Sequence, residues 1–168
     1  VAFHPMWGTE NSGPKAAQKE SFAGRAAVIC DREDSEQDAL ALVENIAKNL
    51  EMHLIYMNAD AHDVHTAYIS HISHITSYAL ANTVLEKERE EDTIFQLASS
   101  GFSSTVRLAK SHPEMWVPIF KQNKENVLDV LNEHITQLRK FKSALEKENF
   151  ELLEELIKNA NKIRGILK

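Results

Sequence analysis

DVHTAYISHISHITSYALANTVL, residues 63–85, contains the longest uncharged run of this chain, because no Lys, Arg, Asp or Glu occurs between Asp63 and Glu86. At helical spacing, about 100° per residue, its apolar side chains share one broad sector and its polar side chains share another. The apolar sector holds Tyr68, Ile69, Ile72, Ile75, Ala79 and Leu80, and the polar one holds Asp63, Ser70, His71, His74 and Tyr78. The pattern predicts a buried helix that carries a polar stripe.

Three explanations for the polar stripe are open, since a buried polar group is costly unless it has a partner. Each histidine could simply bond a backbone carbonyl or a neighbouring helix. The stripe could bind a metal through His62, His65, His71 or His74, although Asp63 is the only carboxylate nearby, and such sites need a further ligand at fixed spacing. The imidazoles, neutral or protonated, could instead line a pocket for an anion or another substrate.

Composition narrows the class of protein. With 168 residues, 43% of them hydrophobic, the chain can bury one good core and a small second lobe. The net charge of −6, without a basic face, argues against a nucleic-acid partner. A single cysteine, Cys30, excludes an internal disulfide and suits the cytoplasm. Because no charged n-region and apolar h-region open these residues, we expect no signal peptide, and the many polar residues within 64–85 argue against a membrane span.

The first 60 residues show an α/β pattern. We expect the end of a strand at 1–3, a buried strand at 26–30, an amphipathic helix over about 36–50 capped by Asp34-Ser35-Glu36, and a strand at 53–57. Strand, helix and strand with short links indicate a βαβ unit, which cannot form a domain unaided. Because no GxGxxG occurs, we expect any dinucleotide-binding turn to precede Val1.

From Asp60 on, the pattern of the chain predicts helix. We expect a short helical piece at 93–98, a break at 99–101, one long helix over 113–146 and a last helix at about 148–164. Their continuous apolar faces favour association into a homodimer. The predicted fold is mostly α: a remnant of an α/β domain, residues 1–60, followed by an all-helical domain, residues 61–168.

Three separated motifs together resemble the prephenate dehydrogenase family. They are His4-Pro5-Met6-x-Gly8-x-Glu10-x-Ser12-Gly13-Pro14, then Ser70-His71-x-x-His74 after His62-Asp63, and finally Gly101-Phe102 followed by Arg107 and Ser111-His112-Pro113-x-Met115-Trp116. The order and spacing of the motifs cover essentially the whole chain.

The resemblance implies an NAD-dependent enzyme of tyrosine biosynthesis that converts prephenate to 4-hydroxyphenylpyruvate by oxidative decarboxylation. It implies a Rossmann domain for NAD followed by a helical domain that dimerises and completes the substrate cleft. This chain then holds the end of the first domain and the whole second domain. Because the NAD fingerprint is absent from these residues, we expect the chain by itself to be inactive.

The resemblance also assigns roles to residues. His4 matches the catalytic histidine, which takes the proton of the ring hydroxyl as hydride leaves. Arg107 matches the arginine that holds a substrate carboxylate. Ser70, His71, His74 and Trp116 match residues that line the prephenate pocket, which we expect to be cationic because prephenate carries two carboxylates. Two alternatives remain: an arogenate dehydrogenase with the same chemistry, and a helical dimerisation module without catalysis.

Overall fold

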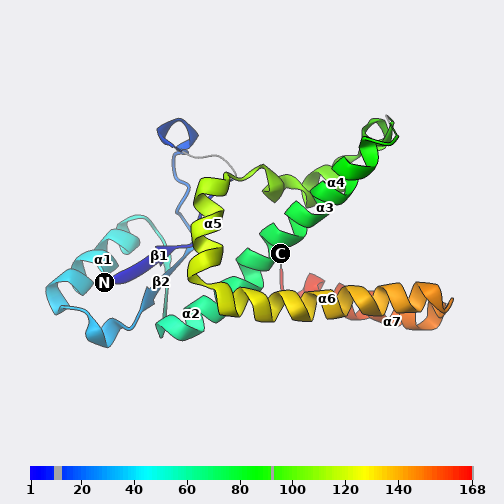
Figure 1. Ribbon diagram of the computed structural model, residues 1–168. Coiled ribbons are helices and arrows are strands. Elements are labelled where there is room, and N and C mark those ends of the chain that lie inside the picture. The colour runs from blue at the N-terminus through cyan, green and yellow to red at the C-terminus, as the bar shows by residue number, and fades with distance from the viewer. Residues whose placement is uncertain (10–12, 92, 168) are drawn as a thin grey trace. The chain divides into compact units, whose positions relative to one another are not determined.

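The structure is a computed structural model that describes residues 1–9, 13–91 and 93–167. Glu10 and Ser12 of the first motif lie outside the described residues. The chain divides into two compact units, Val1–Val127 and Leu128–Lys168 (Figure 1). A small sheet with mostly helical surroundings confirms the predicted fold class.

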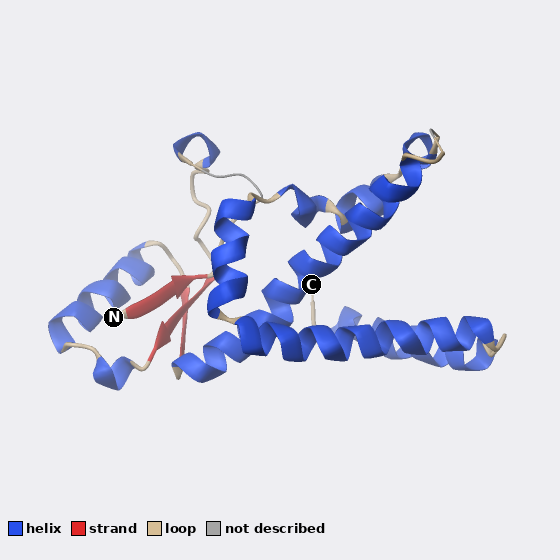
Figure 2. Cartoon of the chain, viewed as in Figure 1, coloured by secondary structure: helices blue, strands red, loops and turns tan. Residues whose placement is uncertain are grey.

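The first unit begins with a three-stranded sheet in the order β1-β2-β3. These strands are β1 (Ala2–Pro5), β2 (Ala26–Cys30) and β3 (His53–Met57), drawn red in Figure 2. β2 pairs in parallel with β3, and the intervening helix α1 (Gln37–Asn49) makes the crossover, so the βαβ prediction is confirmed. β1 pairs antiparallel to β2 and places His4 opposite Val28.

The central strand of the sheet contributes apolar side chains to the core of the first unit. Residues 27–30 of β2 are buried, as expected for a central strand with both faces packed. Ala27 forms a core with Ala47 of α1 and Met52, and Phe3, Phe22 and Leu54 pack against this core. The sheet therefore gives β1, and with it His4, a rigid support.

Two local predictions in this region need correction. The first strand extends through His4 and Pro5 instead of ending at residue 3, because the pairing with β2 continues to Ala27. The residues before α1 do not cap it as predicted: the N-cap is Glu36, and its side chain makes no capping hydrogen bond. Short 3-10 turns occupy η1 (Pro14–Ala16) and η2 (Arg32–Asp34).

The predicted central helix is present, with a wider turn inside it. It consists of α2 (Ala59–Thr66), the π-helical turn η3 (Ala67–His71) and α3 (Ile72–Glu88). The Asn58 side chain caps it by accepting a hydrogen bond from the Ala61 backbone N–H at 2.7 Å. Within η3 the N–H of Ile72 donates to the carbonyl of Ala67, five residues back, which is the hydrogen bond of a π turn.

The burial of this helix confirms the histidines of the polar stripe as buried and departs from the prediction at part of the apolar sector. In this chain Tyr68 and Ile69 of the apolar sector are 44% and 67% exposed, whereas His71 and His74 of the polar stripe are each 8% exposed. These two histidines are buried because they find hydrogen-bond and ring partners within the first unit, whereas Asp63 of the stripe is exposed. Ile72, Ile75 and Leu80 of the apolar sector are half-buried.

The rest of the first unit is a series of short helices. These are η4 (Ile94–Leu97), α4 (Ser100–Thr105), η5 (Arg107–Lys110) and α5 (Pro113–Gln122). Pro113 starts α5, as predicted. The expected break at 99–101 is wrong in part, since α4 begins at Ser100 and includes Gly101.

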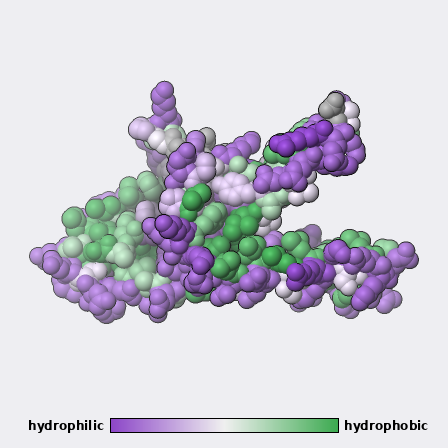
Figure 3. Space-filling model, in the orientation of Figure 1, coloured by the Kyte–Doolittle hydropathy of each residue, from purple (hydrophilic) through white to green (hydrophobic). Residues whose placement is uncertain are grey.

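The predicted helix over 113–146 is instead two helices, α5 and α6 (Lys124–Glu146), divided at Asn123. The second unit contains most of α6, then α7 (Phe150–Asn161) and η6 (Lys162–Gly165). Hydrophobic residues, green in Figure 3, reach the surface along α6 and α7. Leu138, Leu145, Phe150 and Ile157 are all exposed. No described helix is long and apolar enough to cross a membrane.

Candidate active site

All six residues that the sequence singled out line one cavity of the first unit, of about 440 Å³. They are His4, Ser70, His71, His74, Arg107 and Trp116. The other lining side chains are mostly apolar and include Met6, Trp7 and Ile69. We call this space the His4 cavity. A larger hollow of about 600 Å³, lined by α1 and β3 residues such as Glu44 and Lys48, contains none of the six.

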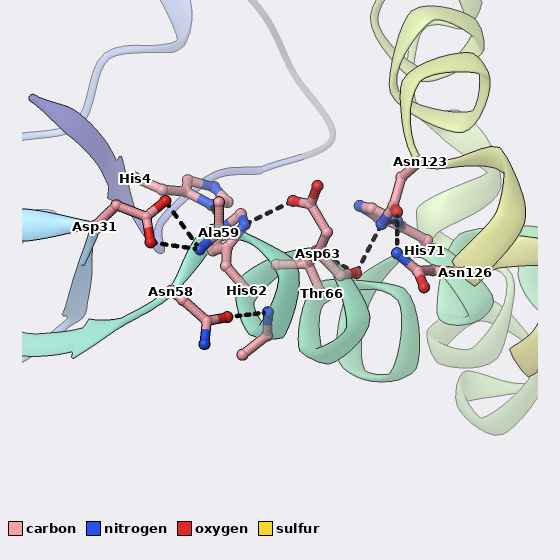
Figure 4. A network of polar contacts seen from close by, with 11 residues as sticks. His4, Asp31, Asn58, Ala59, His62, Asp63, Thr66, His71, Asn123 and Asn126 are labelled. Carbon is pink, nitrogen blue, oxygen red and sulfur yellow. Dashed lines mark hydrogen bonds and ion pairs between the residues drawn. The ribbon is translucent and has the colours of Figure 1, made fainter. Parts of the chain in front are cut away.

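A chain of hydrogen bonds runs behind His4 (Figure 4). Nδ1 of His4 lies 2.8 Å from Nε2 of His62, and Nδ1 of His62 lies 2.9 Å from a carboxylate oxygen of Asp63. A carboxylate only accepts, so Nδ1 of His62 carries a proton; when the His62 ring holds only that proton, its Nε2 accepts a hydrogen bond from Nδ1–H of His4. This arrangement leaves Nε2 of His4 as the unprotonated ring nitrogen.

The environment of His4 keeps the ring neutral. Partial burial, and secondarily the neighbouring His62, lowers the pKa of His4 below its usual value of 6.5. At neutral pH the ring is therefore able to accept a proton, which is the requirement for a general base.

The π turn explains how His62 reaches this site. His62 and His74 are twelve residues apart, which in a regular α-helix separates them by about 120°. A π turn absorbs one extra residue, and this reduces the separation to about 20°. The turn at 67–71 thus places His62, beside His4, on the same side of the helix as the stripe.

His74 is held between a backbone carbonyl and an aromatic ring. Its Nδ1 lies 3.1 Å from the carbonyl of Ser70, so Nδ1 carries the proton and Nε2 is an acceptor. Its ring stacks on Trp116 with centroids 3.4 Å apart and planes inclined by 26°. The Nε1 donor of Trp116 is buried and has no hydrogen-bond partner among the described residues.

The expected cationic pocket is only partly present. Burial lowers the pKa of His71 despite the opposing effect of Asp63, and burial together with Arg107 lowers the pKa of His74. Both imidazoles therefore line the cavity as neutral groups, because desolvation disfavours the charged ring. Of the described lining residues, Arg107 carries the positive charge.

Arg107 is positioned by a buried serine of α3. The hydroxyl of Ser77 donates to the carbonyl of Thr105 at 3.1 Å and accepts from the N–H of Ala109 at 3.0 Å. These two hydrogen bonds hold the backbone two residues before and two residues after Arg107, the first residue of η5. The backbone segment that carries Arg107 is thus hydrogen-bonded to α3.

The structure separates the histidines that could have formed a metal site. His62 contacts His4 and Asp63, His71 contacts Asn123, His74 contacts Ser70 and Trp116, and His65 is exposed. Across residues 1–9, 13–91 and 93–167, no group of three or more His, Cys, Asp or Glu side chains is placed to hold a metal ion.

Two residues of the site network were missed as polar partners: His62 as the partner of His4, and Asn123 as the partner of His71. The adjacent His62-Asp63 pair was a usable signal, since a carboxylate next to an imidazole can fix its tautomer. Asn123 gave no signal, because it lies 52 residues from His71 within an apparently continuous helical pattern.

Comparison with known proteins places the chain in a family. Residues 58–159 match the family described as "Prephenate dehydrogenase, dimerization domain", and residues 1–56 match "Prephenate dehydrogenase, nucleotide-binding domain". The chain belongs to the prephenate dehydrogenase family. The resemblance deduced from the three motifs is thereby confirmed.

Individual relatives agree with this assignment. The chain is 30% identical to the prephenate dehydrogenase of Bacillus subtilis, over 98% of this chain and 44% of that protein. It is 30% identical to the cyclohexadienyl dehydrogenase of Zymomonas mobilis, over the whole of this chain and 58% of that protein. The prephenate dehydrogenase of Aquifex aeolicus, solved in complex with hydroxyphenyl propionate and NAD⁺, superposes with a TM-score of 0.88 at 28% identity, over 99% of this chain and 58% of that one. The chain thus spans about half the length of its relatives.

Proposed function

We propose that the His4 cavity binds prephenate and that the intact protein oxidises and decarboxylates it to 4-hydroxyphenylpyruvate with NAD⁺. The observation that carries this proposal is the convergence of a neutral histidine base, an arginine and neutral imidazoles in one cavity. The family membership and the relatives named prephenate dehydrogenase support it. A helical dimerisation module without catalysis would not require the His4–His62–Asp63 chain.

In the proposed reaction His4 acts as the general base. Its Nε2 accepts the proton of the ring hydroxyl while hydride leaves the same ring carbon for NAD⁺, and loss of CO₂ makes the ring aromatic. Asp63 and His62 hold His4 in the tautomer that leaves Nε2 unprotonated. Because His62 lowers the pKa of His4, it keeps the His4 ring in the form that can accept a proton.

The remaining cavity residues suit the rest of prephenate. Arg107 can hold a carboxylate through a bidentate pair. The hydroxyl of Ser70 and a nitrogen of His71 are neutral groups that bind oxygen atoms without a second buried charge. The ring system of Trp116 adds an apolar wall.

We infer prephenate instead of its amino analogue arogenate from the charges in the cavity. Arogenate carries an ammonium group, which needs an anionic partner when desolvated. No Asp or Glu is among the described residues that line the cavity. Comparing kcat/KM for the two substrates tests this choice, and a preference for arogenate would contradict it.

The described residues do not fit the pyrophosphate of NAD⁺. In this chain the connection from β2 to α1 lacks a glycine-rich turn and instead carries Glu33, Asp34 and Glu36. Anionic side chains at that position repel a phosphate instead of binding it. We therefore propose that the cofactor is bound outside these residues, and that residues 1–60 are the end of the nucleotide-binding domain while residues 61–168 form the substrate-binding and dimerisation domain.

The pH profile of the intact protein tests the state of His4. Since the pKa of His4 is lowered, we expect kcat/KM to be constant near neutral pH and to fall tenfold per unit as pH decreases through a value below 6.5. Protonation of His4 removes the acceptor, so kcat should fall as well. An acid limb centred above pH 7 would mean that another group controls the rate.

We also propose that the protein is a homodimer through its helical region. The exposed Leu138, Leu145, Phe150 and Ile157 exceed what a small monomer leaves in water. An obligate interface of this kind buries about 2,000 Å² or more. Analytical ultracentrifugation of the intact protein should show a dimer that Leu138→Glu weakens and the neighbouring exposed change Gln137→Glu does not. A monodisperse, stable monomer would contradict this.

A further inference from the structure

Asn123 lies at the junction of α5 and α6, and its side chain is turned inward. The residue is only 9% exposed. Its N–H donates to the carbonyl of Ile119 at the end of α5, and its carbonyl accepts from the N–H of Val127 in α6. The backbone at Asn123, with φ −106° and ψ 30°, departs from regular helix there. Asn123 is not among the residues that line the His4 cavity.

The Asn123 amide contacts both the helix that precedes the π turn and the last residue of that turn. Its Nδ2 lies 2.7 Å from the backbone carbonyl of Asp63, before the turn, and 3.3 Å from Nδ1 of His71, the last residue of the turn (Figure 4). The carbonyl of Asp63 also accepts from the hydroxyl of Thr66 at 3.2 Å. A single side chain from the α5–α6 junction thus connects Asp63, the neighbour of His62, with His71 at the end of the turn.

The orientation of this amide is determined by its partners. The Asp63 carbonyl can only accept, so it must face the NH₂ group of Asn123. On the other side, Nδ2 of Asn126 donates to Oδ1 of Asn123 at 2.7 Å. A flipped Asn123 would place an oxygen against the carbonyl and an NH₂ group against an NH₂ group, and would lose both bonds.

The fixed amide determines the tautomer of His71. Because Asn123 presents a donor, Nδ1 of His71 must accept, and the proton of the neutral ring lies on Nε2. His74 has the opposite arrangement, with the proton on Nδ1, which faces the carbonyl of Ser70. The two neighbouring imidazoles therefore offer a ligand one donor, from His71, and one acceptor, from His74.

We propose that Asn123 is a positioning residue that holds His71 as the Nε2–H tautomer and so creates a hydrogen-bond donor for an oxygen atom of the substrate. The role of the donor in substrate binding rests on the proposed function, whereas the tautomer itself does not. Asn126 supports Asn123 from the side away from His71.

The wild-type protein gives the first test. Solid-state ¹⁵N NMR of the intact protein with labelled histidine distinguishes the two tautomers, and the His71 signals are identified by their loss in His71→Gln. We expect protonated Nε2 and unprotonated Nδ1 for His71, and the reverse for His74. A His71 ring with its proton on Nδ1 would overturn the proposal whatever the protein's substrate is.

Two variants then test whether Asn123 is the cause. In Asn123→Asp a carboxylate replaces the donor, so the proton of His71 should move to Nδ1. Asn126→Asp should have the same effect, because a carboxylate at 126 competes with the Asp63 carbonyl for the NH₂ group of Asn123 and draws that group away from His71. If Asn123→Asp does not fold, Asn126→Asp still tests whether the His71 tautomer changes. Asn82→Asp makes the same change at an exposed site of α3 and should leave both tautomers unchanged.

Kinetics separate positioning from a merely structural role. Loss of the Nε2–H donor should raise KM for prephenate about tenfold in Asn123→Asp, with kcat changed much less, because the bond is present in the bound ground state and the transition state alike. An unchanged His71 tautomer in both aspartate variants would overturn the proposal. A changed tautomer without turnover of prephenate by the wild type would leave Asn123 confirmed and refute the proposed function.

Discussion

His4→Asn in the intact protein should lower kcat by about 10²–10⁴ while changing prephenate binding little. The asparagine NH₂ group can still donate to Nε2 of His62, so the hydrogen-bond chain to Asp63 keeps its terminal partner. The substituted residue lacks a ring nitrogen that can take the proton of the substrate hydroxyl. Steady-state kinetics with prephenate and NAD⁺ measure the loss in kcat, and calorimetry with a non-reacting analogue measures binding.

The control for this change is His53→Asn. His53 is an exposed histidine of β3 that does not line the His4 cavity. This variant should retain kcat, and it should keep the acid limb of the pH profile that His4→Asn loses. Wild-type kcat in His4→Asn would remove His4 from the mechanism.

Arg107→Ala should weaken transition-state binding by about 2–5 kcal/mol, expressed mainly as a large rise in KM. The guanidinium supplies the positive charge among the described cavity residues, and a substrate carboxylate would otherwise face only neutral imidazoles. Arg107→Lys should recover part of the loss, since an ammonium keeps the charge but not the bidentate geometry. Initial rates over a wide range of prephenate concentration separate KM from kcat.

Lys110→Ala provides the matched control for Arg107. Lys110 is an exposed cation of the same short helix, η5, and it does not line the cavity. Its removal should leave KM within about twofold of wild type, because exposed charges outside a site contribute little. If Arg107→Ala unfolded the protein without a separable change in KM, Arg107 would be a structural residue.

Regular elements of the fold followed from the sequence where one pattern dominated locally. The apolar run at 26–30, the amphipathic pattern of α1 and the position of Pro113 each predicted an element that the structure contains. The division at Asn123 did not follow, since the three-four repeat of apolar residues continues across it. The break depends on a side chain that bonds Asp63, sixty residues away.

The helix at 63–85 shows why burial could not be deduced from the apolar sector alone. A helical wheel identifies which residues share a face, but not which face meets the rest of the chain. In the structure Trp116 and Asn123 pack on the polar stripe, while Ile69 remains two-thirds exposed. The wheel also assumed a uniform 3.6-residue turn, which the π turn at 67–71 interrupts.

The six candidate site residues were predictable because family motifs carried them, and the structure brings all six to one cavity. The residues that determine the tautomers of His4 and His71 could not be predicted from those motifs. His62 and Asn123 act through tautomers and hydrogen bonds, which depend on distances between segments. No composition or periodicity of the chain encodes those distances directly.

The most direct test of the account is a crystal structure of the intact protein with NAD⁺ and hydroxyphenyl propionate. The account predicts that the ligand occupies the His4 cavity, with its phenolic oxygen within hydrogen-bond distance of Nε2 of His4 and its carboxylate against Arg107. It would be contradicted by a ligand bound outside this cavity, or by a His4 ring whose Nε2 faces away from the phenolic oxygen.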